Sequence, residues 1–150
     1  MARQTYATIL LLAEGTDEGM KAARDAINLA ADEDATLIIA TVVDTTVLRQ
    51  LLASRIFVQE EMEEYERDLD ASCRKQINYV AQLAEKLKVR HETVLLKGSC
   101  HAAIIQEQKR RKADLLIMGA YRTRTAKRDL MASEKQLIVD EVACPVLLVR

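Results

Sequence analysis

Five short, almost purely apolar runs divide the chain, and a helical pattern lies between each run and the next. The runs cover residues 6–13, 35–43, 92–97, 114–118 and 145–149. Runs this short and this continuously apolar are typical of strands buried on both faces of a sheet. Strands that alternate with helices are joined by right-handed crossovers, which makes the sheet parallel. We therefore predict one α/β domain over residues 1–150, with an open, Rossmann-like, five-stranded parallel sheet and helices on both faces.

The intervening segments repeat apolar residues at steps of three and four, which predicts four helices. The fourth is expected to present Leu130, Leu137, Ile138 and Val142. Residues 45–58 fit a loop, a short helix or the start of the long second helix, and the pattern does not choose among them. The predicted helices span residues 17–32, 59–88, 100–112 and 128–142.

The overall charge excludes several classes of partner. Lys and Arg number 22 against 23 Asp and Glu, so the formal net charge is -1, and aromatic residues make up 3% of the chain. This balance gives no general attraction to nucleic acid or to an anionic membrane, and few rings are present to stack on bases. No apolar run approaches the ~18 residues that cross a bilayer. We expect a cytoplasmic protein with neither nucleic acid nor membrane as a partner.

Cysteine and histidine usage also indicates a cytoplasmic protein and argues against a metal site. Cys73, Cys100 and Cys144 form no C-x-x-C pair, and the chain has only two histidines, His91 and His101. Unpaired cysteines indicate a reducing compartment, and so few imidazoles argue against a zinc site. We expect no metal.

Three loops carry the functional expectation, because ligands of open parallel sheets bind beyond the carboxyl ends of the strands. These loops are residues 14–16 after the first strand, 43–44 after the second, and Gly119 onward after the fourth. The last loop, AYRTRTAKR, is rich in arginine and lysine. Arg122 and Arg124 could bind an anion through their guanidinium groups, or the loop could be a solvated connection whose charge only adds solubility.

Several segments together resemble the universal stress protein family. ILLLAEGTDEG is similar to its opening strand and turn, LIIATVVD to its second strand, and LLKGSCHAAIIQ to its third unit. ADLLIMGAYR and VACPVLLVR are similar to its two most recognisable segments. The resemblance implies the strand order 3-2-1-4-5 and a homodimer in which the C-terminal strands, residues 145–149, pair across a two-fold axis. Many members of the family bind ATP or AMP, whereas others do not.

The family's nucleotide motif is G-x-x-G, nine residues, then G followed by Ser or Thr. Here Gly119 matches the first glycine, but Arg122 and Ala132 replace the other two, and Ser133 follows. Glycines in such a cradle turn backbone N–H groups inward at positive φ, a freedom that Arg and Ala lack. Glu134 then adds a negative charge that we expect near the phosphates. The resemblance implies nucleotide contacts at Glu14, Gly15, Val42, Met118, Gly119, Arg122 and Ser133.

Catalysis is poorly supported by the residues. Cys100 follows Ser99, a predicted helix N-cap, and a thiol in the first turn of a helix can have a depressed pKa. His101 is adjacent but points about 100° away along a helix, so it is badly placed to be a base. No Ser/His/acid arrangement is readable in these loops. Seven acidic residues within 60–70 lack the spacing of a calcium loop and fit a solvated helix face.

Two functions follow from these patterns, and a third, enzymatic one (slow nucleotide hydrolysis or thiol chemistry at Cys100) ranks last because it lacks an identifiable base. The first is a non-enzymatic stress-response homodimer that acts through protein contacts, with weak or no ATP binding, because two motif glycines are replaced. The second is a sensor of ATP, AMP or a phosphate compound that uses the cleft between Glu14 and Gly119.

Overall fold

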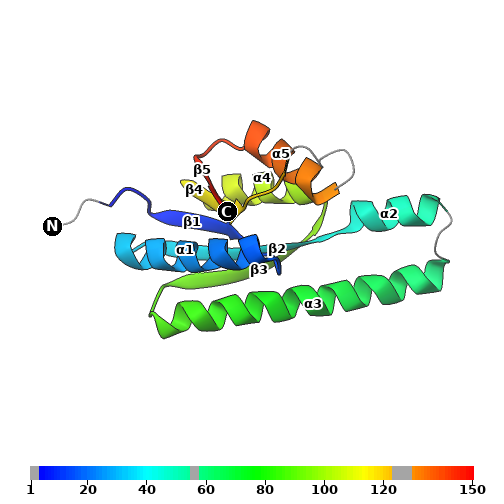
Figure 1. Ribbon diagram of the computed structural model, residues 1–150, viewed down its shortest axis with the longest axis horizontal. Helices are drawn as coiled ribbons and strands as arrows, with labels where there is room; N and C mark the ends of the chain where they lie inside the picture. The colour runs from blue at the N-terminus through cyan, green and yellow to red at the C-terminus, as the bar shows by residue number, and fades with distance from the viewer. Residues whose placement is uncertain (1–3, 55–57, 123–129) are drawn as a thin grey trace.

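The computed structural model describes residues 4–54, 58–122 and 130–150. Ten elements follow one another along the chain: β1 (Thr8–Leu12), α1 (Asp17–Glu33), β2 (Thr36–Asp44), α2 (Thr45–Ala53), α3 (Gln59–Lys86), β3 (His91–Gly98), α4 (Cys100–Arg111), β4 (Leu115–Gly119), α5 (Leu130–Glu141) and β5 (Val146–Val149) (Figure 1). The five predicted strands and the four predicted helices are confirmed. Residues 128 and 129, where the fourth helix was expected to begin, lie outside the described residues.

The strands form one parallel sheet in the order β3-β2-β1-β4-β5, as the resemblance implied. β1 lies at the centre and contributes side chains to both faces. Ile9 and Leu11 belong to one core cluster, whereas Leu10 and Leu12 belong to the other. This period-2 alternation inside an uninterrupted apolar run is what a strand covered on both faces requires.

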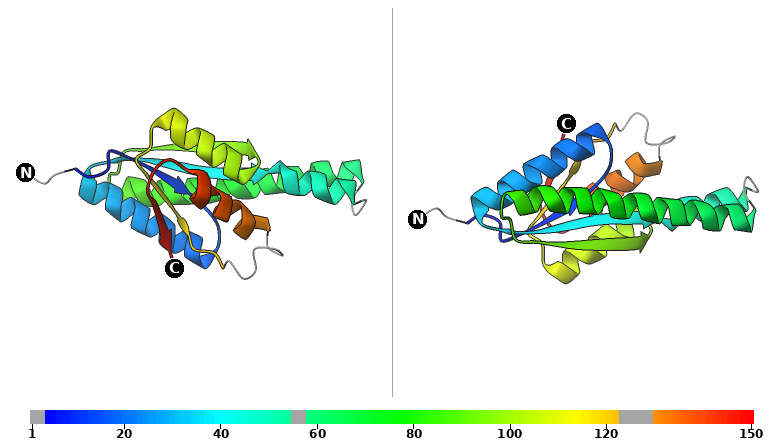
Figure 2. Two further views of the ribbon diagram at one scale, coloured as in Figure 1. Left: turned by 90° about the horizontal axis from the view of Figure 1, so that it is seen from above. Right: turned by 90° about the horizontal axis from the view of Figure 1, so that it is seen from below.

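Each core cluster fills the space between the sheet and one helix layer. α1 and α3 cover one face, and α4 and α5 cover the other (Figure 2). α1 packs closely because its buried stripe is made of small side chains, among them Ala22, Ala23 and Ala26. Small residues allow a helix to approach a sheet of Leu and Ile side chains without overpacking.

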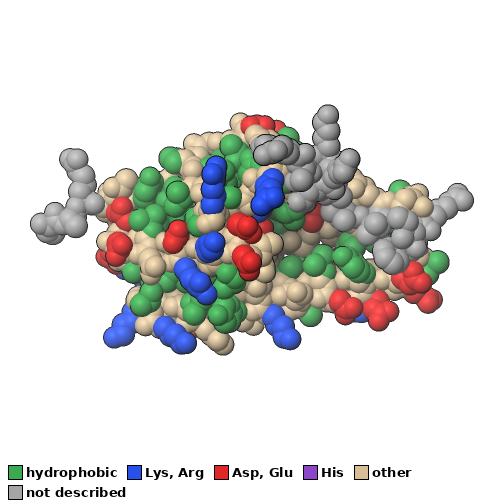
Figure 3. All heavy atoms as spheres, in the orientation of Figure 1, with side chains coloured by type: hydrophobic (Ala, Val, Ile, Leu, Met, Phe, Trp, Pro, Cys, Tyr) green, Lys and Arg blue, Asp and Glu red, His purple; other side chains and the backbone are tan. Residues whose placement is uncertain are grey.

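The stretch that the sequence left open forms the short helix α2, which Asp44 caps. α2 lies beside the amino-terminal part of α3, and both extend beyond the sheet (Figures 1 and 2). α3 has 28 residues, so it is about 42 Å long at 1.5 Å per residue. Acidic side chains gather over its outer end in Figure 3, and Glu60, Glu61, Glu63 and Glu64 are all exposed. A solvated acidic face is therefore what the described part of this helix presents.

One prediction about α5 is wrong. Leu137 was expected to face inward, but 38% of it is exposed, whereas Ile138 is fully buried. Adjacent helical residues point about 100° apart, so only one of the two can face the sheet. The inward stripe runs instead through Ala132, Lys135 and Ile138, at steps of three.

Candidate functional site

The loops after β1 and β4 meet at the carboxyl edge of the sheet, and Gly119 makes their approach possible. A Cβ atom on Gly119 would lie 2.8 Å from Gly19 N and 2.9 Å from the carbonyl carbon of Glu18. Both are backbone atoms of the first turn of α1, which cannot swing aside as a flexible side chain can. Among the described glycines, Gly98 alone has a positive φ, at 120°. Gly119 is thus needed for close packing and not for a left-handed turn.

A second glycine in the same contact was missed by the sequence analysis. A Cβ atom on Gly19 would lie 2.5 Å from Glu14 O, so the end of β1 and the start of α1 pack backbone to backbone. Thr16 fixes the helix start, since its hydroxyl accepts a hydrogen bond from Gly19 N at 3.0 Å. The available signal was a glycine inside the first turn of a helix, where it carries an entropic penalty unless packing demands it.

Lys135 reaches from α5 into this edge. Its ammonium lies 2.7 Å from Glu14 Oε2 and donates a hydrogen bond to Gly119 O at 3.1 Å. Lys135 is only 4% exposed, which is rare for a lysine unless it is paired. Glu14 and Gly119, the two residues that were predicted to bound the cleft, are therefore joined by an internal cation.

Glu134, the neighbour of Lys135, points elsewhere. Its carboxylate forms an ion pair with His101 Nδ1 and accepts a hydrogen bond from Ser99 Oγ at 3.3 Å. The sequence led us to expect the charge of Glu134 near the phosphates of a bound nucleotide; in the structure α5 directs this carboxylate toward the start of α4. The amino-terminal parts of α4 and α5 are thereby held together.

Ser99, His101 and Glu134 form a Ser/His/acid cluster that the sequence did not reveal, because the carboxylate comes from a helix 33 residues further along the chain. Ser99 Oγ lies 2.8 Å from His101 Nδ1, and Glu134 contacts the same nitrogen. In a nucleophilic triad the hydroxyl and the carboxylate bind opposite ring nitrogens, so that the ring can take a proton from one while the other orients it. This cluster does not have that arrangement.

Asp44, in the second of the three predicted loops, is committed to helix capping. Its carboxylate accepts hydrogen bonds from Thr46 N at 3.0 Å and from Cys100 N at 3.2 Å. One buried side chain therefore satisfies the otherwise unpaired amide groups at the starts of α2 and α4.

Comparison with known proteins identifies the chain at the family level. The model of the family described as "Universal stress protein family" matches residues 5–150. The chain belongs to the universal stress protein family. The universal stress protein MJ0531 of Methanocaldococcus jannaschii is 29% identical over 147 residues, which are 97% of this chain and 82% of the relative. A universal stress protein of Thermus aquaticus is 39% identical over 61 residues, 41% of this chain and 44% of the relative.

Solved structures support the same fold at low sequence identity. The hypothetical protein MJ0577 superposes with a TM-score of 0.79 at 18% identity, over 96% of this chain and 95% of that one. A universal stress protein in complex with cAMP gives a TM-score of 0.71 at 21% identity, over 97% of each chain. One from Archaeoglobus fulgidus in complex with dAMP gives 0.63 at 10% identity, over 99% of this chain and 100% of that one.

Seven residues were predicted to contact a nucleotide in the manner of other universal stress proteins, and they differ in accessibility. Val42, Met118 and Gly119 are buried, Glu14 and Ser133 are half-buried, and Gly15 and Arg122 are exposed. The structure links Glu14 to Gly119 through Lys135, which the sequence analysis had not proposed as a site residue. Arg124, the other predicted anion contact, lies outside the described residues.

The Cys100 thiol does not have the depressed pKa that its position in the first turn of a helix suggested. Burial is the main factor that raises its pKa, and the nearby carboxylates of Glu14, Glu134 and Asp44 raise it further. Both effects disfavour the thiolate. The thiol is therefore a small, neutral core group.

Within residues 4–54, 58–122 and 130–150, no three His, Cys, Asp or Glu side chains are grouped so that they could hold a metal ion. Over the same residues, no helix has both the length and the apolar character that a membrane span needs.

Proposed function

We propose that this universal stress protein is a non-enzymatic, cytoplasmic stress-response homodimer that acts through protein contacts and binds ATP or AMP weakly or not at all. The observation that carries the proposal is the position of Lys135. Its ammonium bridges Glu14 Oε2 and Gly119 O, at the edge where a nucleotide of the family's kind would contact the chain.

A nucleotide would have to compete with this ion pair. Glu14 is the carboxylate expected to contact the ribose or adenine, and it already holds a buried cation. Separating the two groups leaves a charge in a site of low polarity, and removing one partner of a buried pair costs about 3–5 kcal/mol. Moreover, Arg122 and Ala132 stand at two motif glycines, so the backbone donors of the cradle are not available to repay that cost.

The proposed dimer uses β5, one outer strand of the sheet. Leu147 and Leu148 in this strand are exposed, and Leu137 in the adjoining helix is exposed as well. An edge strand with apolar side chains and open backbone groups is a template for pairing with another chain. A second copy that presents the same strand would cover the apolar side chains and pair the open backbone groups across a two-fold axis.

Equilibrium titration with ATP and with AMP in the presence of Mg²⁺ tests the nucleotide part of the proposal. We expect no saturable binding in the micromolar range, and a micromolar dissociation constant would refute it. Sedimentation of the wild type beside Leu148→Glu tests the dimer, since a buried like-charge pair at β5 is expected to give monomers.

The second candidate function, a sensor of nucleotides or phosphate compounds, is favoured by one observation. Two structural neighbours are complexes with cAMP and with dAMP, and Lys135 and Arg122 supply cations at the matching edge. In this case a phosphate draws Lys135 away from Glu14, and the ligand raises the melting temperature of the wild type. Arg122→Ala should abolish that rise. Absence of any stabilisation by nucleotide or inorganic phosphate in the wild type would exclude this candidate.

A further inference from the structure

β3 forms the end of the sheet opposite β5, and its outer edge has no neighbouring strand among the described elements (Figure 2). All eight residues of β3, His91–Gly98, are in register with β2. The edge is therefore long and regular, and no strand of the described residues pairs with its outer side.

The direction of its backbone groups follows from one hydrogen bond. Leu37 N donates to Arg90 O at 2.8 Å, so the backbone of Arg90 and of every second residue after it faces β2. Because the backbone groups of a strand alternate between its two sides, the N–H and C=O groups of residues 91, 93, 95 and 97 face outward. Four N–H donors and four C=O acceptors thus line the outer edge of β3, where another strand could pair with them.

Side chains alternate between the two faces of the sheet in the same way. Lys97 points to the α3 side, where its ammonium lies 3.4 Å from Asp70 Oδ2. Val94 and Leu96 point to the α4 side, where they pack against the second core cluster. A strand added beside β3 would place alternate side chains on these two sides.

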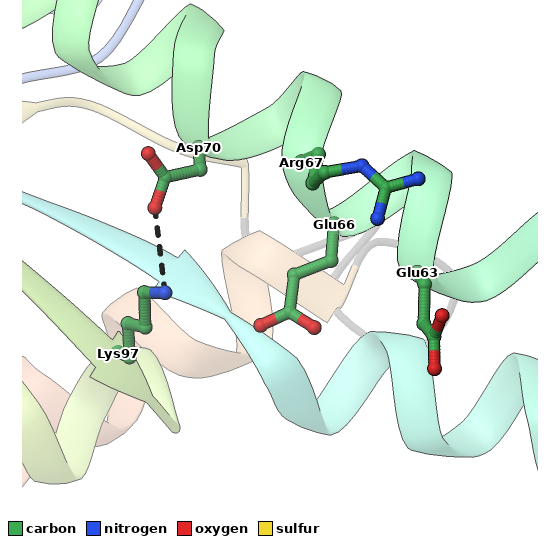
Figure 4. A pocket seen from close by; sticks show the side chains of 5 residues that line it. All are labelled: Glu63, Glu66, Arg67, Asp70 and Lys97. Carbon is green, nitrogen blue, oxygen red and sulfur yellow. Dashed lines mark ion pairs between the residues drawn. The ribbon is translucent and has the colours of Figure 1, made fainter.

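A hollow lies on each side of the sheet at the carboxyl end of β3. On the α3 side, a hollow of about 370 Å³ is lined by Glu63, Glu66, Arg67, Asp70 and Lys97 (Figure 4). Its lining carries three carboxylates against two cations. Among the described residues, neither Glu63 nor Glu66 lies within ion-pair distance of a cation. This side therefore favours a positively charged side chain.

On the α4 side, a hollow of about 490 Å³ includes Leu96, Ala103, Gln106 and Arg110 in its lining. Leu96 and Ala103 give it an apolar floor, and Arg110 is held by the buried carboxylate of Glu107. A small or β-branched side chain fits this surface without leaving a charge unpaired.

A lysine along an edge strand normally discourages pairing with another strand, and Lys97 lies on this edge. Here its ammonium is held at the rim of the hollow by Asp70 (Figure 4). Asp70 also accepts a hydrogen bond from Arg74 Nε at 2.6 Å, which fixes the carboxylate. The side chain of Lys97 is thus drawn toward the α3 face.

We propose that the outer edge of β3 accepts an extended segment of a partner protein as a sixth strand, with basic side chains of that segment beside Glu63 and Glu66. The inference rests on the proposed function, in which the protein acts through protein contacts. Main-chain hydrogen bonds would supply the affinity and the two hollows the specificity.

The test uses the full chain and synthetic eight-residue peptides that alternate Thr with Lys. We expect saturable binding that slows amide hydrogen exchange by about tenfold or more at Thr93 and Leu95, whose N–H groups face outward. The N–H groups of Val94 and Leu96 face β2, so their exchange should not change. A Thr–Glu peptide should bind at least about tenfold more weakly, a difference of about 1.4 kcal/mol, and N-methylation of alternate peptide amides should abolish binding.

Thr93→Pro removes one outward N–H group and leaves the pairing with β2 intact, since proline is tolerated at an edge. It should abolish peptide binding, whereas Thr93→Val should retain it. Slow exchange at Ile38 and Ile39 would show that the variant is folded.

The absence of binding by the Thr–Lys peptide, or binding that Thr93→Pro leaves unchanged, would overturn the proposal. So would a smaller assembly of Thr93→Pro without peptide, because a second copy would then be the occupant. Nucleotide binding by the wild type would count against the proposed function alone.

Discussion

Lys135 on α5 and Glu14 after β1 form a buried ion pair, with 2.7 Å between the ammonium nitrogen and Glu14 Oε2. The two residues are far apart in the sequence, and their contact joins the last helix to the first strand. It also places the positive charge of Lys135 at the carboxyl edge of the sheet. Without Glu14, a negatively charged ligand would be the natural counter-ion for this charge.

Replacing Lys135 with Met should destabilise the protein, because Glu14 is left in a poorly solvated site without its cation. We expect a loss of about 3 kcal/mol in the free energy of unfolding, measured by urea denaturation. The double variant Glu14→Gln/Lys135→Met should recover part of that loss, since neither charge remains. Lys21→Met, at an exposed position of α1, serves as the control and should change stability by less than about 0.5 kcal/mol. Equal losses in Lys135→Met and Lys21→Met would contradict a structural role for the ion pair.

Gly119→Ala should be destabilising by about 1–3 kcal/mol, because the added Cβ atom would meet the backbone of Gly19 at 2.8 Å and overpack the contact. Gly15→Ala is the matched control. Its nearest neighbour would be Gln76 Oε1 at 3.5 Å, an ordinary contact, so its effect should be small. Thermal unfolding of the two variants separates these outcomes, and similar melting temperatures would show that the Gly119 contact relaxes at little cost.

The Cys100 thiol should resist alkylation in the folded protein. Burial raises its pKa far above the ordinary 9.0, so the thiol stays protonated at neutral pH and is shielded from reagents. Mass spectrometry after iodoacetamide treatment should find Cys100 unmodified in buffer and modified in concentrated urea. Rapid labelling of Cys100 in the folded state would contradict this assignment.

The same raised pKa makes a prediction about pH. In the unfolded chain the thiol loses its proton near pH 9.0, whereas in the folded chain it keeps it. The unfolded state then binds fewer protons, so the free energy of unfolding falls as the pH rises above about 9. Cys100→Ala should reduce this alkaline slope, which urea denaturation at a series of pH values can measure.

Ser99→Ala should weaken the start of α4 by about 1 kcal/mol, because the Ser99 hydroxyl accepts the Ala102 N–H group as an N-cap. The variant also removes the hydroxyl that contacts His101 and Glu134. Ser99→Thr keeps an N-cap oxygen and should lose less. The comparison uses urea denaturation, and equal losses in both variants would show that packing, not capping, is affected.

The strand order and the positions of all the described helices except α2 were accessible from the sequence, because buried parallel strands leave continuous apolar runs and family segments occur in order. The direction of each side chain on α5 was not. Leu137 and Ile138 are equally apolar, so hydrophobicity alone does not say which one faces the sheet. The buried lysine on the inward stripe broke the pattern that would have set the helical phase.

The contacts of the site were less accessible still. Glu14 and Gly119 were identified as edge residues from topology, since both follow strands of the sheet. Their link through Lys135 depends on the phase of α5, and the meeting of Ser99 with Glu134 depends on how two helices pack. Neither spacing nor composition records such tertiary contacts.

Glu134 and Lys135 are adjacent letters with opposite charges, and α5 sends one to α4 and the other to Glu14. If the two letters were transposed, mass, net charge and composition would stay the same, yet a carboxylate would meet Glu14 and an ammonium would meet His101. The sign of the charge at this edge therefore depends on the order of these two residues in the sequence. Relatives with one fold can diverge in what they attract through an exchange that leaves the composition unchanged.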